Sequence, residues 1–405
     1  MLLEPYRVLD CTGQLGWLTG RFLADLGADV IKIEPPGASL DAPGWRADNV
    51  NKRLLTLDLK SESGKSLFRK LAAQVDFLIE TAQPGTDGAA LFDPETLRAA
   101  NPKLIHVSIT PFGRTGPHAE WRASDLELMA SSGAMSLAGE PGQMPLRISY
   151  PQSNPWAASQ AAVGAMVALH KRGVTGLGDH VDVSAQSAVI ISIAHAPSFY
   201  DMLGQNPTRA GAFMTGRSVH GAVYRVFWPC KDGYVNFIIY GGVAGRRTNE
   251  GLCAWMHDAG AEMGVLSTID WATFDSTQTT QAQVDAMEGP IGRFFLTVTK
   301  AEFLQQAFER EMLGYPVSNV HDIANDPQLA ERGFWHDLPG PDGKSERFNG
   351  GFAMVDGQRL GVRRGVPKPG EHDQAILNEF GIASKDAQPN GASQSATAKR
   401  VTAGE

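Results

Sequence analysis

Residues 7–34 read RVLDCTGQLGWLTGRFLADLGADVIKIE, and this stretch decides the fold. Apolar and polar residues alternate over 6–11 and again over 29–34, which predicts two β-strands. A glycine-containing turn over 12–16 and a predicted helix at about 17–27 connect them. A strand, a helix and a second strand in this order form a βαβ unit, and such units build parallel sheets with right-handed crossovers.

The same succession of elements continues along the N-terminal half of the chain. We expect further strands over 54–59, 76–80 and 103–110, and helices over 61–74, 94–100 and Asp125–Ser132. Ser61 is an N-cap type residue at the start of its helix. Together these elements predict a doubly wound α/β domain over roughly 1–190.

The pattern changes after residue 200. Residues 221–242 contain two apolar runs around a Lys-Asp-Gly turn, which predicts an antiparallel hairpin. We expect helices at about 247–259, 280–287 and 300–312, and a short strand, a helix and a returning strand over 313–338. Residues 384–405 are rich in Ser, Ala, Gly and Gln, which predicts a disordered tail.

An Ala- and Gly-rich segment, 156–169, stands between these two parts. It is polar at only two positions, so it predicts a helix that is buried all round. Asn154 is expected to cap this helix, with Pro155 at the first helical position. Basic residues followed by a glycine over 170–173 predict its end.

The composition is that of an ordinary globular protein, with 42% hydrophobic and 20% charged residues. The formal net charge of −8 argues against a nucleic-acid or acidic-membrane partner. Three scattered cysteines, with no C-x-x-C motif, indicate neither a disulfide framework nor a metal site. The N-terminus does not read as a signal peptide and no apolar run reaches about 18 residues, which predicts a cytoplasmic protein without a membrane span.

The glycines of the first βα turn do not match a dinucleotide-binding fingerprint. Gly13, Gly16 and Gly20 lack the G-x-G-x-x-G spacing, and two prolines directly follow Glu34. Structural glycines are therefore favoured over a dinucleotide site, and no P-loop motif occurs.

A small basic group consists of residues 51–53 (Asn-Lys-Arg) and Lys60. It is compatible with a solvated edge or with phosphate contacts, and the sequence leaves both interpretations open.

Seven segments together resemble the family III CoA-transferases, the group that contains formyl-CoA transferase and the α-methylacyl-CoA racemases. They are 7–37, 49–71, 76–85, 108–117, 139–145, 168–184 and 325–335, and the resemblance covers about 1–380. It implies a Rossmann-like large domain over 1–200 and 330–383 and a smaller α+β domain over 215–325. It also implies a dimer whose two chains interlock as rings.

The resemblance also locates the family's nucleophile. In the transferases an aspartate opens the Ala-rich helix and attacks the acyl-CoA, while CoA moves between two acids. Counting back from Ala168-Leu169 places this position at Asn154. An amide is neutral and a poor nucleophile, so we expect no catalytic residue there.

Other family positions have changed as well. Glu80-Thr81-Ala82 replaces a glutamate-asparagine-aromatic sequence, and no arginine occurs over 35–44. No glycine run precedes the 221–242 hairpin, and Ala123-Ser124-Asp125 stands where the racemases carry a histidine.

Four residues still match family positions near CoA: Gln14, Leu57, Lys60 and Arg122. The resemblance therefore implies residual CoA contacts, with CoA or acyl-CoA as a substrate of the complex and no tightly bound cofactor.

One branch of the family works as two unlike subunits, of which one lacks the aspartate, and this chain resembles that subunit. The implied role is a non-catalytic partner of a catalytic paralogue, in a heterodimer or heterotetramer that moves CoA from succinyl-CoA to an aryl-substituted succinate in anaerobic degradation of aromatic hydrocarbons. Two alternatives stay open. One is a homodimeric transferase or racemase that uses Asp125 or Glu140 as a base, and the other is an acyl-CoA binding protein without catalysis.

Overall fold

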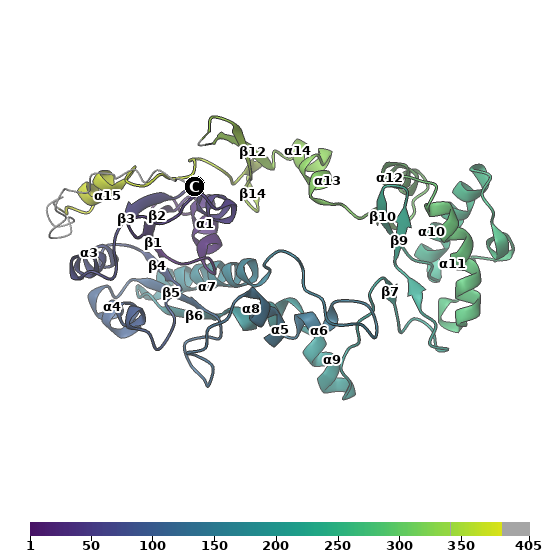
Figure 1. Cartoon of the computed structure of the whole chain (residues 1–405), viewed down its shortest axis with the longest axis horizontal. Coiled ribbons are helices and arrows are strands. Elements are labelled where there is room, and N and C mark those ends of the chain that lie inside the picture. The colour runs from purple at the N-terminus through teal and green to yellow at the C-terminus, as the bar shows by residue number, and fades with distance from the viewer. Residues whose placement is uncertain (341, 383–405) are drawn as a thin grey trace, which may run out of the picture. The chain divides into compact units, whose positions relative to one another are not determined.

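The computed structural model describes residues 1–340 and 342–382 and divides into two compact units (Figure 1). The first comprises Met1–Ser132, Ile148–Ala194 and the chain from Ala330 onward, and the second comprises Gly133–Arg147 and His195–Leu329. The domain ranges inferred from the sequence stay predictions, and the tail expected over 384–405 lies outside the described residues.

The first unit is built on a six-stranded parallel sheet with the order β3-β2-β1-β4-β5-β6. Its strands are β1 (Arg7–Cys11), β2 (Asp29–Glu34), β3 (Arg53–Thr56), β4 (Phe77–Glu80), β5 (Ile105–Thr110) and β6 (His180–Ser184). This is the strand order of doubly wound sheets, which reverses between β1 and β4. The α/β class and the parallel sheet predicted from the sequence are confirmed.

Helices pack on both faces of this sheet. Apolar side chains of α1 (Trp17–Asp25) and α7 (Ser153–Thr175) share one core cluster with the strands, together with α5 (Asp125–Ser131) and α8 (Ala185–Ser192). The opposite cluster includes α3 (Glu62–Ala72), α4 (Pro94–Ala100) and α15 (Asp373–Glu379). The unit also contains α2 (Pro43–Asn49), the 3-10 helix η1 (Asp87–Phe92) and the antiparallel pairs β12 (Trp335–Pro339) with β13 (Ser345–Asn349) and β14 (Met354–Val355) with β15 (Gln358–Arg359).

Helix α3 shows how local sequence sets these elements. The Ser61 hydroxyl accepts a hydrogen bond from the Gly64 N–H at 3.0 Å, so Ser61 is the N-cap that the sequence predicts. Helix α2 was not predicted, because its seven residues carry too little periodicity to be distinguished from a loop.

Helix α7 differs from the prediction at both ends. Its N-cap is Gln152, and Asn154 lies inside the first turn, so the assignment of Asn154 as the cap is wrong. The reason is that the capping acceptor comes from another element, the Asp125 carboxylate described below. The helix also passes Gly173 and ends at Gly176, whose left-handed φ of 75° closes it.

Burial of α7 also differs from the prediction. Its sheet-facing stripe is made of small residues, among them Ala157, Ala161 and Ala165, which are fully buried. The opposite face carries Val163 and Val167, with relative exposures of 57% and 64%. The apolar composition alone could not distinguish a helix buried on every side from one with an uncovered apolar face.

Three buried charges fix the turn after β1. The Lys52 Nζ lies 2.8 Å from Asp10 Oδ2, and both side chains are fully buried. Lys32 Nζ lies 3.9 Å from Asp10 Oδ1 and donates to the Thr12 carbonyl at 2.7 Å. Burial alone would raise the pKa of the Asp10 carboxyl, but Lys52 and Lys32 outweigh it and hold that pKa below its ordinary value.

These contacts correct both interpretations for Lys52 and Arg53, and they do not concern Lys60. Lys52 is neither solvated nor available to a phosphate, and Arg53 is buried between the carboxylates of Asp29 and Glu379. Lys60 alone is exposed.

The second unit combines helices with small antiparallel sheets. Strands β9 (Phe227–Cys230) and β10 (Gly233–Phe237) form the predicted hairpin, which pairs with β11 (Gly314–Pro316). The remaining strands are β7 (Phe213–Met214) and β8 (Tyr224–Arg225), and the helices are α6 (Ala134–Leu137), α9 (His195–Leu203), α10 (Gly242–Asp258), α11 (Gln281–Phe295), α12 (Lys300–Glu309) and α13 (Val320–Ala324), with 3-10 turns η2 (Gly264–Thr268) and η3 (Ser276–Gln278). The boundary between the two units falls within helix α14 (Pro327–Glu331). Helix α11 continues through Pro290 to Phe295, well beyond the end predicted at residue 287.

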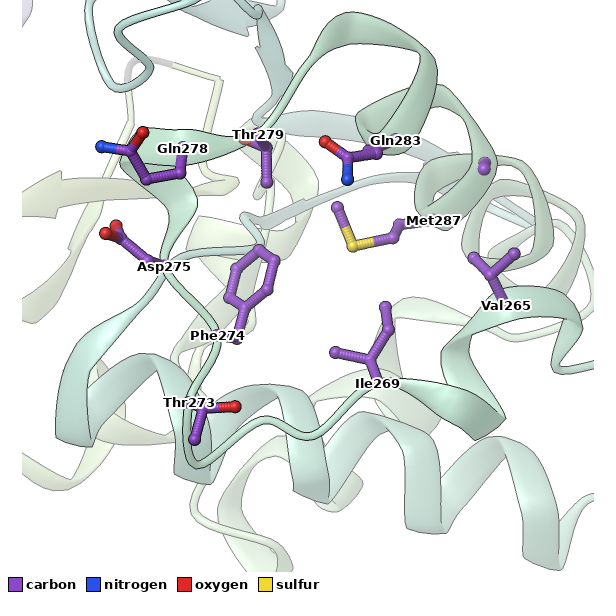
Figure 2. A pocket seen from close by; sticks show the side chains of 10 residues that line it. Val265, Ile269, Thr273, Phe274, Asp275, Gln278, Thr279, Gln283 and Met287 are labelled. Carbon is purple, nitrogen blue, oxygen red and sulfur yellow. The ribbon is translucent and has the colours of Figure 1, made fainter.

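A cavity of about 480 Å³ opens in this unit (Figure 2). Ile269, Phe274 and Met287 give it apolar walls, and Thr279 and Gln283 line another part of it. The Gln283 side-chain oxygen accepts a hydrogen bond from the Thr280 N–H at 2.8 Å, so this side chain is held by the start of α11. None of the residues expected near CoA lines this cavity.

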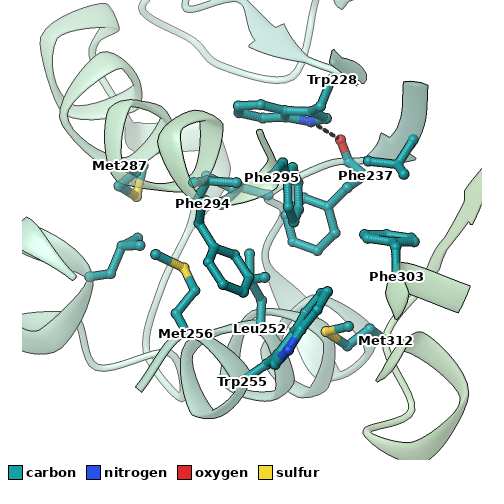
Figure 3. Packing of buried hydrophobic residues seen from close by; sticks show 14 of the residues in the cluster. Trp228, Phe237, Leu252, Trp255, Met256, Met287, Phe294, Phe295, Phe303 and Met312 are labelled. Atoms are coloured by element: carbon teal, nitrogen blue, oxygen red, sulfur yellow. Dashed lines mark hydrogen bonds between the residues drawn. The ribbon is translucent and has the colours of Figure 1, made fainter. Parts of the chain in front are cut away.

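The core of the second unit is aromatic (Figure 3). The ring of Phe295 packs edge-on against Trp228 and Phe303, with ring centroids 5.6 and 5.5 Å apart. The buried Trp228 Nε1–H donates to the Phe237 carbonyl at 2.7 Å, which satisfies its polar atom inside the core.

Within residues 1–340 and 342–382, no helix has the length and apolar content that a membrane span requires.

Gly20 tests the buried charge cluster. A Cβ at this helical position would lie 2.2 Å from Asp10 Oδ2 and 2.9 Å from Lys52 Nζ. We expect Gly20→Ala to lower the free energy of unfolding by about 2 kcal/mol or more, measured by urea denaturation. At Gly173 in α7, an added Cβ would meet no atom within 4 Å, so Gly173→Ala should instead be neutral or raise stability by about 0.5–1 kcal/mol. Equal effects of the two substitutions would contradict the role given to Gly20.

Candidate functional site

The strand order marks the carboxyl edge of the sheet beside β1 and β4 as the candidate site. Strands β1 and β4 are neighbours at the point where the order reverses, and in such sheets ligands bind outside the carboxyl ends of these strands. Gly13 follows β1 and Thr81 follows β4, and the Gly13 N–H donates to Thr81 Oγ1 at 2.7 Å. This contact joins the loop after β1 to the loop after β4.

The residues expected near CoA have different surroundings at this edge. Gln14 follows β1 and is exposed, and Lys60 follows β3 and is exposed. Leu57 also follows β3, but its side chain is buried in the core beneath α3. Arg122 is exposed on the connection between β5 and α5. CoA contact by these four residues stays a prediction.

Glu80, the last residue of β4, lies in a buried polar group. Its Oε1 lies 3.4 Å from His106 Nε2 and 3.4 Å from Arg114 Nη1, and the side chain is inaccessible to solvent. Because Arg114 comes from the loop after β5, this buried carboxylate ties the carboxyl end of β4 to that loop.

Ser108 of β5 and His180 of β6 extend the polar group around Glu80. The Ser108 hydroxyl lies 2.9 Å from His180 Nε2, and His180 pairs in register with His106 on the neighbouring strand. Burial, followed by the nearby His106 and Arg114, lowers the pKa of the His180 imidazole to about 4. The sequence analysis missed His106, Arg114 and His180, although polar residues at alternate positions of a buried strand are a usable signal.

The start of α7 is capped from outside the helix. Asp125 Oδ1 accepts hydrogen bonds from the N–H groups of Gln152 and Ser153 at 2.7 and 2.8 Å, and from the Ser153 hydroxyl at 2.9 Å. A carboxylate at this end of the helix also interacts favourably with the helix dipole. Asp125 therefore caps the helix at Gln152 and Ser153, ahead of the position at which Asn154 was expected to cap it.

Asn154 follows directly in the first helical turn. It is partly buried, and its amide forms no hydrogen bond with any residue that the structure describes. The side chain is therefore not held as a structural cap. Its chemistry is limited to donating and accepting hydrogen bonds, because a neutral amide has no carboxylate to attack an acyl group.

The two residues considered as alternative bases are placed differently. Asp125 is engaged by three hydrogen bonds at the start of α7. Glu140 is exposed in the second unit. Its carboxylate lies against Gly211, since a Cβ added to that glycine would be 2.2 Å from Glu140 Oε2. Within the described ranges no group of three or more His, Cys, Asp and Glu side chains is arranged to hold a metal ion.

The candidate site thus combines the carboxyl edge of a doubly wound sheet with a helix start that carries Asn154 in its first turn and is capped by Asp125. Sequence comparison assigns this geometry to a family: the chain belongs to CoA-transferase family III, which matches residues 3–373. The predicted resemblance is confirmed.

Particular relatives narrow the comparison. The succinyl-CoA:(R)-benzylsuccinate CoA-transferase subunit BbsE of Thauera aromatica is 33% identical over 404 residues, covering 93% of each chain. The succinate–glutarate CoA-transferase of Agrobacterium fabrum is 28% identical over 408 residues, covering 96% of this chain and 98% of its own. Among solved structures, a CAIB/BAIF family protein from Brucella suis superposes with a TM-score of 0.79 at 27% identity, covering 93% of this chain and 98% of the other.

Removing the Asp125 carboxylate should destabilise the start of α7. We expect Asp125→Ala to lower the free energy of unfolding by about 1–2 kcal/mol, because three donors lose their acceptor. Asp125→Asn keeps an oxygen at the same place and should cost about 0.5 kcal/mol or less. Thermal and urea unfolding measure both, and an Asp125→Ala protein as stable as the parent would rule out the capping role.

His180 should make stability depend on pH. Its pKa is about 4 in the folded protein and 6.5 in the ordinary state, so the unfolded chain takes up the proton first as pH falls. The free energy of unfolding should therefore decrease between about pH 6.5 and 4, by about 1–2 kcal/mol after allowance for partial exposure of the ring. His180→Gln should flatten this part of the profile. Parallel profiles for the parent and the variant would show that another group is responsible.

Proposed function

We propose that this chain is the non-catalytic subunit of a heteromeric family III CoA-transferase. The complex moves CoA from succinyl-CoA to an aryl-substituted succinate in anaerobic degradation of aromatic hydrocarbons. The partner is a catalytic paralogue that carries the nucleophilic aspartate, and the two chains interlock. CoA enters as a substrate of the complex.

Asn154 carries this proposal. It occupies the first turn of α7, where the family resemblance implies the aspartate that forms an acyl anhydride. The Asp125 carboxylate at the same helix start already accepts three hydrogen bonds as the cap. With Thr81 hydrogen-bonded to the neighbouring loop in place of the family's asparagine, the nucleotide contacts have changed as well.

The relatives support a subunit role. BbsE is named as a subunit of a transferase whose donor is succinyl-CoA and whose acceptor is (R)-benzylsuccinate. Identity of 33% over nearly the whole of both chains supports the same donor and an aryl-substituted acceptor here.

An uncovered apolar surface supports association with a second chain. Val163 and Val167 of α7 are largely exposed, and they line a cavity of about 660 Å³ together with Phe22, Met166 and Phe352. Isolated globular chains rarely expose a contiguous apolar surface of this kind, which is typical of interfaces. The catalytic paralogue is the partner that we assign to it.

Separate purification and mixing test the function. The chain alone should transfer no CoA from succinyl-CoA to benzylsuccinate, whereas the chain mixed with its paralogue should do so. The aspartate-to-asparagine change in the paralogue should abolish the activity of the mixture. Asn154→Asp in this chain should restore neither activity nor a covalent acyl or CoA adduct by mass spectrometry, because Thr81 and Ala82 are also altered.

Each contrary result points elsewhere. Substantial transfer or racemisation by the isolated chain favours the homodimeric enzyme. Tight one-to-one binding of succinyl-CoA to the lone chain by calorimetry, with no complex by native mass spectrometry, favours an acyl-CoA binding protein. An adduct on Asn154→Asp would show that the nucleotide site has stayed functional.

A further inference from the structure

A polar cavity lies at the amino ends of the parallel strands, on the edge of the sheet opposite the candidate site. Arg7, Asp29 and Arg53 are the first residues of β1, β2 and β3. They line a cavity of about 560 Å³ together with Arg363, Arg364 and Glu379. Residues from the first strands of the sheet and residues from 363–379 therefore line the same charged cavity of the first unit.

The carboxylates of this cavity are already paired. Arg53 Nη1 donates to Glu379 Oε1 at 2.8 Å, and Arg53 Nε donates to Asp29 Oδ1 at 2.8 Å. Arg7 adds a further contact to Glu379 at 3.4 Å. These four side chains balance, with two positive and two negative charges.

Arg363 and Arg364 add two positive charges to the cavity that no lining carboxylate neutralises. One guanidinium nitrogen of Arg363 donates to the Ala24 carbonyl. The guanidinium of Arg364 forms neither a salt bridge nor a hydrogen bond within the described residues, although its charge attracts the Glu379 carboxylate. The cavity thus has a net charge of +2 in a chain whose formal net charge is −8. A local positive potential of this kind attracts anions.

The backbone of Arg363 and Arg364 is held by hydrogen bonds to the buried residue Asn51. Asn51 Oδ1 accepts from the N–H groups of Arg363 and Arg364 at 2.6 and 2.9 Å, and the Asn51 N–H donates to the Arg364 carbonyl at 3.1 Å. Asn51 is buried with a left-handed φ of 73°, a conformation that non-glycine residues adopt at a cost. The backbone is therefore fixed at the two residues whose guanidinium groups line the cavity without a salt bridge among the described residues.

We infer that this cavity binds a small, multiply charged anion of the phosphate or polycarboxylate class through Arg363 and Arg364. Guanidinium groups bind such anions by paired, charge-assisted hydrogen bonds. The cavity volume falls in the range of small-ligand sites. This cavity lies at the opposite edge of the sheet from the candidate site, and its ligand would be additional to the proposed transfer of CoA.

Calorimetry on the full chain at constant ionic strength tests this site, with inorganic pyrophosphate and citrate as probes. Pyrophosphate should bind saturably at one site per chain, and Arg364→Gln should weaken it about tenfold or more. Arg364→Lys keeps the charge and should retain more of the affinity. Arg332 is an exposed arginine of the same unit outside the cavity, so Arg332→Gln should bind like the parent.

The measured pattern decides the assignment. Binding of citrate with equal loss in Arg364→Gln identifies the polycarboxylate class, and binding of pyrophosphate alone identifies the phosphate class. No saturable binding to the parent, or equal affinities of Arg364→Gln and Arg332→Gln, would overturn the site. Circular dichroism checks that the variants fold, which is expected because the hydrogen bonds of Arg364 come from its backbone. None of these outcomes bears on the CoA-transferase proposal, since activity is not the readout.

Discussion

The buried pairing of Asp10 with Lys52 is the constraint on which the carboxyl edge of the sheet depends. Both charges are removed from water, so each is stable only with the other in place. Lys52 also donates to the Trp17 carbonyl, and Asp10 accepts from the Thr12 N–H, so the pair fixes where β1 ends and α1 begins. The geometry of the turn after β1, which borders the candidate site, therefore depends on this buried contact.

The start of α7 shows how a fold can be kept while its chemistry changes. A carboxylate from α5 satisfies the first donors of the helix, so the stability of the helix does not depend on residue 154. That position is therefore free to lose a carboxylate without loss of structure. The proposed division between a catalytic and a supporting subunit requires this independence of helix capping from nucleophilic chemistry.

Local patterns in the sequence predicted a large part of the fold and less of the site. Five of the six strands of the parallel sheet, β1 to β5, were predicted with ends within three residues of those observed, because alternation and turn residues act over short distances. The cap of α7 was not, since its acceptor, Asp125, comes 28 residues before Ser153 in the chain. Lys52 was interpreted as accessible for the same reason, because its partner Asp10 lies 42 residues away. Asn154 was located by family resemblance, and the polar group around Glu80 emerged only when β4 and β5 were placed side by side.

The exposed valines of α7 bear on how such a protein is made in a cell. An exposed apolar helix face is a binding site for chaperones and a cause of aggregation. In the proposed complex the paralogue covers this face, so synthesis of the two chains in matched amounts keeps the unassembled fraction low and proteolysis removes the surplus. Under that proposal the abundance of this chain follows that of the paralogue, whatever the rate of its own translation.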